Sequence, residues 1–368
     1  MPKFLLIIFL TLTLYANDRL SLADDYFAQK EYGRALQLYV EIAHEKKDPK
    51  IAYKIAWMYD NAHGTVKNQA ESQRWYKRAA EWSATDEDLA KSVEKLYRSY
   101  DPVSSTTTSE TMLQYMSGAF FLRAFHPNYV VVSFLDTVPQ GDLSQVNQNF
   151  IKAETKFQLS LRGDYLSNWF GGDQIWTVAY TQRSYWQLFI SSEPFRETNY
   201  MPEAFVTVPF FHLLDAAGIK GAALGFIHQS NGQKEYYDPT SSNTVNLSRS
   251  WNRLYIKTHY QWGSFFGYLN LWYPISSTGT LHDNADIVDY YGLGELEVNY
   301  AYGKLLSRFN GRYNIRKNRG AAQVELTYPV GSSKRVFYYL QGFTGYGQSL
   351  IDYHNYINQV GFGISVSR

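Results

Sequence analysis

Residues Gly225–Tyr255 read GFIHQSNGQKEYYDPTSSNTVNLSRSWNRLY. Two segments with alternating apolar and polar residues flank a turn-rich insert here, and this pattern predicts two neighbouring strands. Residues i and i+2 of a strand point to the same face, so His228 and Ser230 should lie side by side, roughly 6–7 Å apart along the backbone. An imidazole at that spacing can take the proton of a serine hydroxyl, as a nucleophilic serine requires.

Asn252, in the second segment, completes a candidate catalytic group. If the two segments pair, its amide oxygen can hold the far ring nitrogen of His228 and fix the imidazole tautomer, as the carboxylate does in the usual triad. A His-x-Ser pair alone is common and is usually without catalytic meaning. Here, however, His228 continues the apolar face of Leu224 and Phe226, and a polar group on such a face costs free energy unless it has a use.

The motifs HxSNG and SRSWNRLY resemble those of the outer-membrane phospholipase A family. Three upstream stretches resemble the same family in the same order: KFQLSL (Lys156–Leu161), YTQRSYWQL (Tyr180–Leu188) and PFRETNYMPE (Pro194–Glu203). The resemblance extends from about Phe125 to the C-terminus, and it implies a membrane β-barrel with a catalytic triad on its outer surface. It implies that His228 is the general base, that Ser230 is the nucleophile and that Asn252 orients His228.

The same resemblance implies an oxyanion site and a calcium site. A backbone N–H at Gly232, helped by water on a bound calcium, would stabilise the oxyanion, and a glycine there permits close approach to the substrate. Calcium prefers oxygen ligands. The family's ligands correspond to the Ser248 hydroxyl, the Gln233 carbonyl and the partner subunit's Ser192.

The insert leaves the calcium ligands open. In the family DPTS and SRSWN are adjacent, whereas other residues separate them in this chain. Either Ser241 or Ser248 could therefore be the serine ligand, and Asp238 or Glu235 could join it. We favour Ser248 because it keeps the family's spacing to Asn252. Plain turn chemistry is the alternative role for these serines.

Gln182 falls among Val178, Tyr180 and Trp186 on one face of an expected strand. A glutamine that faces hydrocarbon leaves its amide unsatisfied, and the same residue of a second subunit could satisfy it across a two-fold axis. The family has such a glutamine at its dimer interface, so the resemblance implies a homodimer that completes the calcium site with the partner subunit's Ser192. Alternatively, Gln182 faces the lumen through a bulge.

The composition fits a membrane barrel. The 368 residues include 32 Tyr, 9 Trp and no Cys. Amphipathic rings in such number suit the aromatic girdles at the two membrane interfaces. Beyond the N-terminus no run of about 18 apolar residues occurs, so helical membrane spans are not expected. The formal charge of +1 gives no electrostatic reason to expect a nucleic acid as partner.

From about residue 129 the apolar period becomes two. Twelve strands are expected, near residues 128–137, 153–166, 174–189, 196–211, 218–230, 249–262, 264–275, 289–302, 304–316, 319–330, 335–346 and 354–366. An even number is typical of a single-chain membrane barrel and puts both chain ends in the periplasm. A soluble β-sandwich is the rival fold, but it does not explain such long strands with exposed Trp and Tyr.

The opposite strand faces carry charges of both signs, which favour a hydrogen-bonded, filled lumen over an ion pathway. These residues are Arg183, Glu197, Arg253, Lys257, His259, Glu295, Glu297 and Glu325.

Four segments are expected: a signal peptide at 1–16, a helical repeat domain at 17–98, a linker at 99–124 and the all-β transmembrane barrel at 125–368. Lys3, the apolar stretch Phe4–Tyr15 and Ala16 form the signal pattern. Residues 52–80 resemble a Sel1-like repeat, a relative of the tetratricopeptide repeat, with a turn at Gly64–Val66. Such repeats usually present a groove to another protein. A helical plug or spacer without a partner is the alternative.

The sequence thus predicts a calcium-dependent phospholipase of the bacterial outer membrane, active as a homodimer on phospholipids and lysophospholipids. The alternatives are a passive porin-like barrel and a barrel that anchors a periplasmic protein-binding repeat. Head-group preference, sn-1 or sn-2 choice, the trigger for dimerisation and the partner of the repeats are left open.

Overall fold

The computed structural model describes residues 19–83, 94, 97–98, 100–105, 107–109, 111–112, 123–139, 149–167, 173–238, 243–275, 284–333 and 335–368. The chain divides into two compact units, Met1–Ser117 and Gly118–Arg368. The expected signal peptide at residues 1–16 lies outside the described residues. In the part of the chain that is described, every helix is too short or too polar to span a membrane.

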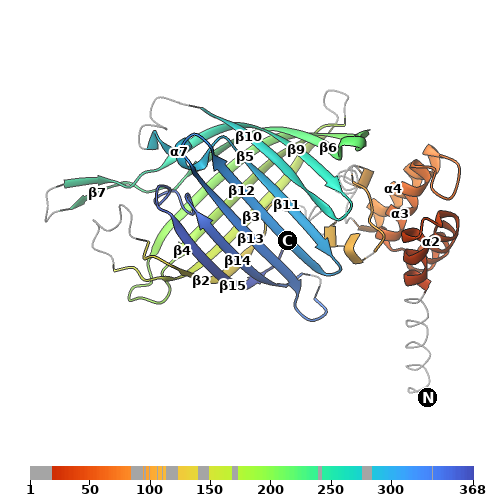
Figure 1. The fold of residues 1–368 in the computed structure, drawn as a ribbon, viewed down its shortest axis with the longest axis horizontal. Coiled ribbons are helices and arrows are strands. Elements are labelled where there is room, and N and C mark those ends of the chain that lie inside the picture. The colour runs from red at the N-terminus through yellow and green to blue at the C-terminus, as the bar shows by residue number, and fades with distance from the viewer. Residues whose placement is uncertain are drawn as a thin grey trace, which may run out of the picture. The chain divides into compact units, whose positions relative to one another are not determined.

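The first unit is helical (Figure 1). A helix at residues 19–28 is followed by α2 (Tyr32–Lys46), α3 (Pro49–Asp60) and α4 (Gln69–Ser83). Asp48 caps α3 by accepting a hydrogen bond from the Lys50 N–H at 2.9 Å, and Pro49 suits the first turn because no amide donor is needed there. Helices α3 and α4 flank the turn at Gly64, an arrangement compatible with the expected repeat.

A buried lysine ties these helices to the chain that follows them. The Nζ atom of Lys54 lies 2.7 Å from Asp24 Oδ1, 3.1 Å from the Tyr39 hydroxyl and 2.6 Å from the Ser104 carbonyl oxygen. Burial lowers the pKa of Lys54, and the charge of Asp24 opposes that shift. The stretch expected as a polar linker thus begins with residues held against α3.

The second unit is a closed barrel of twelve antiparallel strands. They are β2 (Tyr129–Leu135), β3 (Ala153–Ser167), β4 (Ile175–Trp186), β5 (Phe195–Leu214), β6 (Ile219–Ser230), β9 (Ser250–Trp262), β10 (Phe265–Ile275), β11 (Gly294–Tyr302), β12 (Leu305–Asn314), β13 (Arg319–Pro329), β14 (Phe337–Gly345) and β15 (Ile357–Ser365). Pairing of β15 with β2 closes the barrel, and the short β1 (Arg123–Ala124) pairs with β3. All twelve expected strands are therefore confirmed.

Two local expectations were wrong. The strand expected from residue 289 begins at Gly294, because Ile287–Tyr291 form the short helix α7. The insert after β6 is more than a turn. It forms a two-stranded hairpin, β7 (Glu235–Asp238) with β8 (Asn243–Asn246), which extends beyond the end of the barrel (Figure 1).

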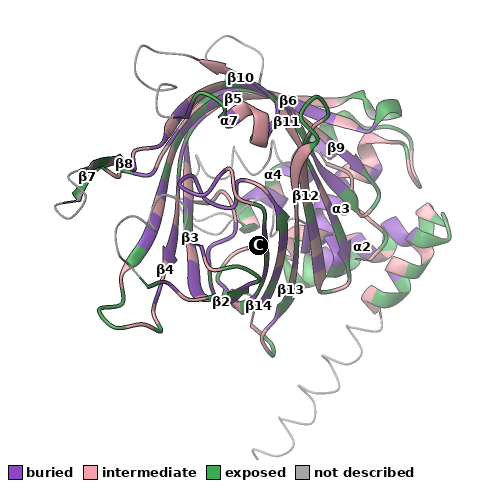
Figure 2. Ribbon diagram, turned by 60° about the vertical axis from the view of Figure 1, so that its left-hand side comes forward, coloured by how far each residue is buried: buried purple, intermediate pink, exposed green. Residues whose placement is uncertain are grey.

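The barrel is apolar outside and polar inside. Exposed and buried residues alternate along its strands, as Figure 2 shows. Outward-facing residues are mainly large and apolar, with Phe134 58% exposed and Val360 54% exposed. Buried positions instead include Lys156, Glu297 and Gln341. This distribution is the reverse of a soluble protein and suits contact with hydrocarbon, so the β-sandwich alternative was wrong.

A buried ionic cluster fixes the barrel end at which β6 terminates. Arg196, at the start of β5, lies 2.7 Å from Glu154 and 2.5 Å from Asp352, and all three side chains are 0% exposed. Asp352 belongs to the connection between β14 and β15, where Leu350 and Ile351 are also fully buried. This connection therefore folds inward and joins the starts of β3 and β5.

Candidate active site

His228 and Asn252 lie opposite each other in the ladder that joins β6 and β9. The distance from His228 Nδ1 to Asn252 Oδ1 is 2.7 Å. Because an amide oxygen only accepts hydrogen bonds, this contact puts the ring proton on Nδ1 and leaves the lone pair of Nε2 available. The imidazole is thereby held in the tautomer that a general base needs.

Ser230 follows His228 on the same outward face, at the end of β6. Along this face Leu224 is 59% exposed and Phe226 is 40% exposed, whereas His228 and Ser230 are half-buried. Among the described contacts, His228 and Ser230 share no hydrogen bond. Catalytic hydrogen bonds of this kind often tighten only when substrate binds. The three residues therefore gather where an apolar face meets the mouth of the barrel.

Asn231 draws the two ends of the insert together. Its Oδ1 atom accepts hydrogen bonds from the N–H groups of Gln233 at 3.2 Å and Arg249 at 3.0 Å. Its Nδ2 atom donates to the Leu247 carbonyl at 2.8 Å. Asn231 was not singled out from the sequence, although an Asn next to a Gly is a turn signal that could have identified it. Through it, Gln233 and Ser248 lie at the base of the hairpin despite the insert.

Gly232 has a backbone φ of +63°, a conformation that favours glycine. A Cβ atom at this position would lie 3.0 Å from the Tyr200 ring. Tyr200 also faces Ser230 across the ladder between β5 and β6. Tyr200 was not identified from the sequence, because its local pattern does not show that it lies opposite Ser230 on the neighbouring strand.

The remaining candidate calcium ligands belong to separate segments of the chain. Ser241 lies outside the described residues, and Glu235 is exposed and pairs with Asn246 in the hairpin. Ser192 lies in the separate turn between β4 and β5, with a φ of +66°. In the described chain no group of three His, Asp or Glu side chains is arranged to hold a metal. A calcium site here would depend on hydroxyl and carbonyl oxygens, which this ion accepts.

Gln182 lies on the outer face of β4, where its neighbours across the ladders are Leu159 and Tyr200. Its Oε1 atom accepts a hydrogen bond from the Tyr180 hydroxyl at 3.1 Å, and its Nε2 atom donates to Ser184 Oγ at 3.4 Å. The amide is therefore satisfied in part within its own subunit. Gln182 therefore points outward, and not into the lumen as the alternative with a bulge would require.

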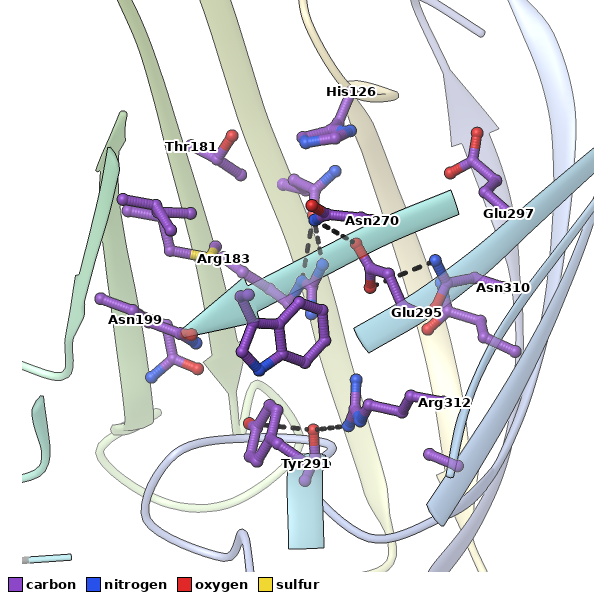
Figure 3. A pocket seen from close by; sticks show the side chains of 18 of the residues that line it. His126, Thr181, Arg183, Asn199, Asn270, Tyr291, Glu295, Glu297, Asn310 and Arg312 are labelled. Atoms are coloured by element: carbon purple, nitrogen blue, oxygen red, sulfur yellow. Dashed lines mark hydrogen bonds between the residues drawn. The ribbon is translucent and has the colours of Figure 1, made fainter. Parts of the chain in front are cut away.

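The lumen holds a polar cavity of about 170 Å³ (Figure 3). Asn270 and Asn310 each donate a hydrogen bond to Glu295 at 3.4 Å, and Arg312 donates to the Gly347 carbonyl at 2.8 Å. Arg183 and Glu297 also line the cavity. Side chains of both signs thus occupy the described interior, as the mixed charges of the sequence predict.

The chain is similar to known proteins over the barrel. Residues 105–366 match the family model described as Phospholipase A1. The phospholipase A1 of Salmonella typhimurium is 36% identical over 260 residues, which cover 70% of this chain and 85% of that relative.

Two solved structures share the fold. The Salmonella typhi outer membrane phospholipase dimer with bound calcium is 36% identical, with a TM-score of 0.60, and the match covers 67% of this chain and 93% of the other. An active-site mutant of Escherichia coli outer membrane phospholipase A, with alanine in place of an asparagine, is 32% identical with a TM-score of 0.59. That match covers 72% of this chain and 99% of the other.

Proposed function

This chain belongs to the phospholipase A1 family, and on that premise we propose that it is an outer-membrane phospholipase that hydrolyses acyl esters of phospholipids and lysophospholipids. The observation that carries the proposal is the 2.7 Å contact between His228 and Asn252 beside Ser230, on a face made of exposed apolar residues. An ester of a membrane lipid can reach such a group without leaving the bilayer surface.

Ser230 is the nucleophile of the proposed reaction. Its Oγ atom attacks the ester carbonyl carbon while His228 Nε2 takes the hydroxyl proton. The tetrahedral intermediate then collapses to an acyl-enzyme, and the same proton passes to the departing glycerol oxygen. Water next attacks the acyl group with His228 again as the base. This step releases the fatty acid and regenerates the Ser230 hydroxyl. Asn252 holds the His228 ring throughout, without contributing a negative charge.

The Gly232 N–H is the proposed donor to the oxyanion. Gly232 follows Ser230 by two residues, and its positive φ lets the backbone turn beside the nucleophile without strain. Tyr200, packed against this glycine, supports the turn. A preorganised donor at the developing negative charge stabilises the transition state more than the ground state.

The residues at the base of the hairpin fit a calcium ion. Ser248 and the Gln233 carbonyl would hold it from one subunit, together with the partner subunit's Ser192. The bridging hydrogen bonds of Asn231 support this assignment, because they bring the first two residues to one corner. A related dimer from Salmonella typhi contains bound calcium. When bound, calcium would supply positive charge, through a bound water, that helps to stabilise the developing oxyanion.

A homodimer follows from the same proposal. Gln182 faces outward in a row that continues through Tyr200 to Ser230. A contact between two Gln182 side chains across a two-fold axis would therefore lie on the lipid-facing surface that also carries the nucleophile. Formation of the dimer would then control both the calcium site and the protein surfaces that enclose the substrate.

We place the barrel in the outer membrane with the triad near the outer boundary. The even strand number then puts the helical unit in the periplasm, where it has either a protein partner or a role as a spacer.

Fatty acid release from phospholipid micelles tests the proposal. The wild-type protein should release fatty acid with calcium, and the Ser230→Ala protein should not. Persistent release by Ser230→Ala would reject the mechanism. Release that is indifferent to a chelator would reject the calcium site.

Two rival functions make different predictions. A passive porin-like barrel would conduct ions and would leave phospholipid intact. A barrel that only anchors the helical unit would also be inactive as a hydrolase. Deleting residues 18–98 should preserve hydrolysis if the barrel is the enzyme.

A further inference from the structure

A hollow of about 520 Å³ lies on the outer face of β13, β14, β15 and β2. In the order of strands around the barrel, β14 is six strands from β6, so this hollow is on the side opposite the triad. Its volume falls in the range of about 300–1,000 Å³ typical of small-molecule sites. The hollow is therefore large enough for a ligand and separate from the proposed active site.

Gly342 creates the hollow. Outward-facing residues alternate along β14, and Gly342 takes one of these positions between Leu340 and Thr344. Its neighbours across the ladders are Val324 and Val360, both exposed. Apart from Gly342 and its two chain neighbours, no described residue has a heavy atom within 4 Å of a Cβ built at Gly342. The missing side chain thus leaves an apolar notch with a valine on each side, and Phe134 of β2, opposite Val360, also lines it.

Polar groups gather where the hollow reaches the triad end of the barrel. Thr344 Oγ1 lies 2.6 Å from Asn358 Oδ1, and Asn358 Nδ2 donates to Asp136 Oδ2 at 2.6 Å. The Asn358 N–H donates to the other oxygen of Asp136 at 3.0 Å. These bonds lower the pKa of Asp136, so its exposed carboxyl group is charged near neutral pH.

Lys152 supplies the opposite charge at the same place. Its Nζ atom donates to the Asp136 carbonyl oxygen at 2.6 Å, and both side chains are exposed. An anionic and a cationic group therefore lie together at one end of an apolar notch. This pattern matches a zwitterionic head group joined to an acyl chain.

We propose that this hollow is a second, non-catalytic lipid site that holds one zwitterionic phospholipid, with an acyl chain in the notch at Gly342 and the head group against Asp136 and Lys152. The head-group amine would face Asp136 and the phosphate would face Lys152. The inference rests on the membrane location in the proposed function. It does not depend on hydrolysis, because its residues lie outside β6 and β9, the two strands that carry the triad.

Native mass spectrometry of the full-length Ser230→Ala protein tests the site. The probe is phosphatidylethanolamine supplied in nanodiscs. The Ser230→Ala substitution prevents hydrolysis of this probe. Replacing Gly342 with Leu in this background should reduce the number of retained phospholipids by one, because the new side chain fills the notch. Leu340→Phe is the matched control: it adds outward bulk on the same strand but outside the notch, and it should retain the full number.

The head-group assignment has its own measurement. Asp136→Asn combined with Lys152→Gln should lower retention of phosphatidylethanolamine about tenfold, and phosphatidylglycerol should be held more weakly than phosphatidylethanolamine by the parent protein. Equal retention of the two lipids by the parent would overturn this assignment. Unchanged retention in Gly342→Leu, or equal loss in Leu340→Phe, would overturn the site itself.

Fatty acid release separates this inference from the proposed enzyme. With Ser230 intact, Gly342→Leu should hydrolyse phospholipid as fast as wild type. If neither protein releases fatty acid, the enzyme proposal fails, while the number of retained lipids still decides whether the second site exists.

Discussion

His228 and Asn252 are register partners across two strands that an insert separates in sequence, and their side chains meet at 2.7 Å. The ladder sets this contact, because opposite residues of an antiparallel pair project to the same side. The insert changes the length of the connection between the strands and leaves their register intact. The geometry of the base therefore depends on strand pairing rather than on the loop.

Replacing Asn252 tests how far the imidazole depends on that contact. Asn252→Ala should lower kcat about 10- to 100-fold, since a lost hydrogen bond to the catalytic histidine costs about 1–3 kcal/mol. Asn252→Asp keeps an acceptor and should retain more activity than Asn252→Ala. Ser250→Ala, beside the triad in β9, serves as the control and should hydrolyse normally. Full activity in Asn252→Ala would remove Asn252 from the mechanism.

The two serine candidates for calcium can be separated by titration. Ser248→Ala should raise the calcium concentration needed for half-maximal hydrolysis about tenfold, equivalent to roughly 1.4 kcal/mol of lost binding. Ser241→Ala should leave that concentration unchanged. The reverse result would assign the ligand to Ser241. Similar calcium curves for both variants and wild type would exclude both hydroxyl groups.

The proposed dimer can be measured by sedimentation equilibrium in detergent with calcium present. Gln182→Leu should weaken association about threefold, which corresponds to the average of about 0.6 kcal/mol for hydrogen bonds between membrane-embedded segments. The effect is small because Tyr180 and Ser184 already bond this amide. Leu340→Ala, on β14, should associate as wild type does. Equal association of all three proteins would place the interface elsewhere.

Arg196 should be indispensable to barrel stability. Arg196→Met leaves Glu154 and Asp352 buried without their cation, and such a loss costs about 3–5 kcal/mol. Lys317→Met breaks a partly exposed surface pair with Asp289 and should cost at most about 1 kcal/mol. Urea unfolding of both variants in lipid vesicles gives the comparison. Equal losses in the free energy of unfolding would mean that the buried ion pairs stabilise the barrel no more than the surface pair does.

The helical unit should respond to pH through Lys54. Burial lowers the pKa of Lys54 below its ordinary value of 10.5. Between the two pKa values the unfolded chain binds more protons than the folded chain, so the free energy of unfolding rises with pH. Lys54→Met should remove this rise, which lies below the ordinary lysine pKa of 10.5. The helical circular dichroism signal during heating of the full chain measures it, and parallel pH curves would contradict the assignment.

Sequence reasoning worked where one pattern repeats. Period-two alternation identified all twelve strands because each strand has one lipid face and one lumen face. The last three residues of α7, 289–291, were mistaken for the start of a strand because two of them are tyrosines, which favour strands. The hairpin was missed because the turn-forming residues of DPTSSN dominate the insert.

Long-range contacts could not be read in the same way. Arg196 meets Asp352 from 156 residues away in sequence, and only closure of the barrel brings them together. The same is true of Gly342 and Phe134, which share a hollow although they lie near opposite ends of the barrel sequence. A single sequence shows which residues are polar or small, but not which strands become neighbours.

The bridging of the hairpin base by Asn231 makes the β7–β8 segment modular. Its ends are fixed by three hydrogen bonds, so the chain between them can vary in length and content while Ser230 and Asn252 keep their places. Longer loops of this kind cost little additional entropy. The segment is therefore a natural insertion point, at which a foreign peptide could be displayed at the triad end of the barrel while the enzyme remains intact.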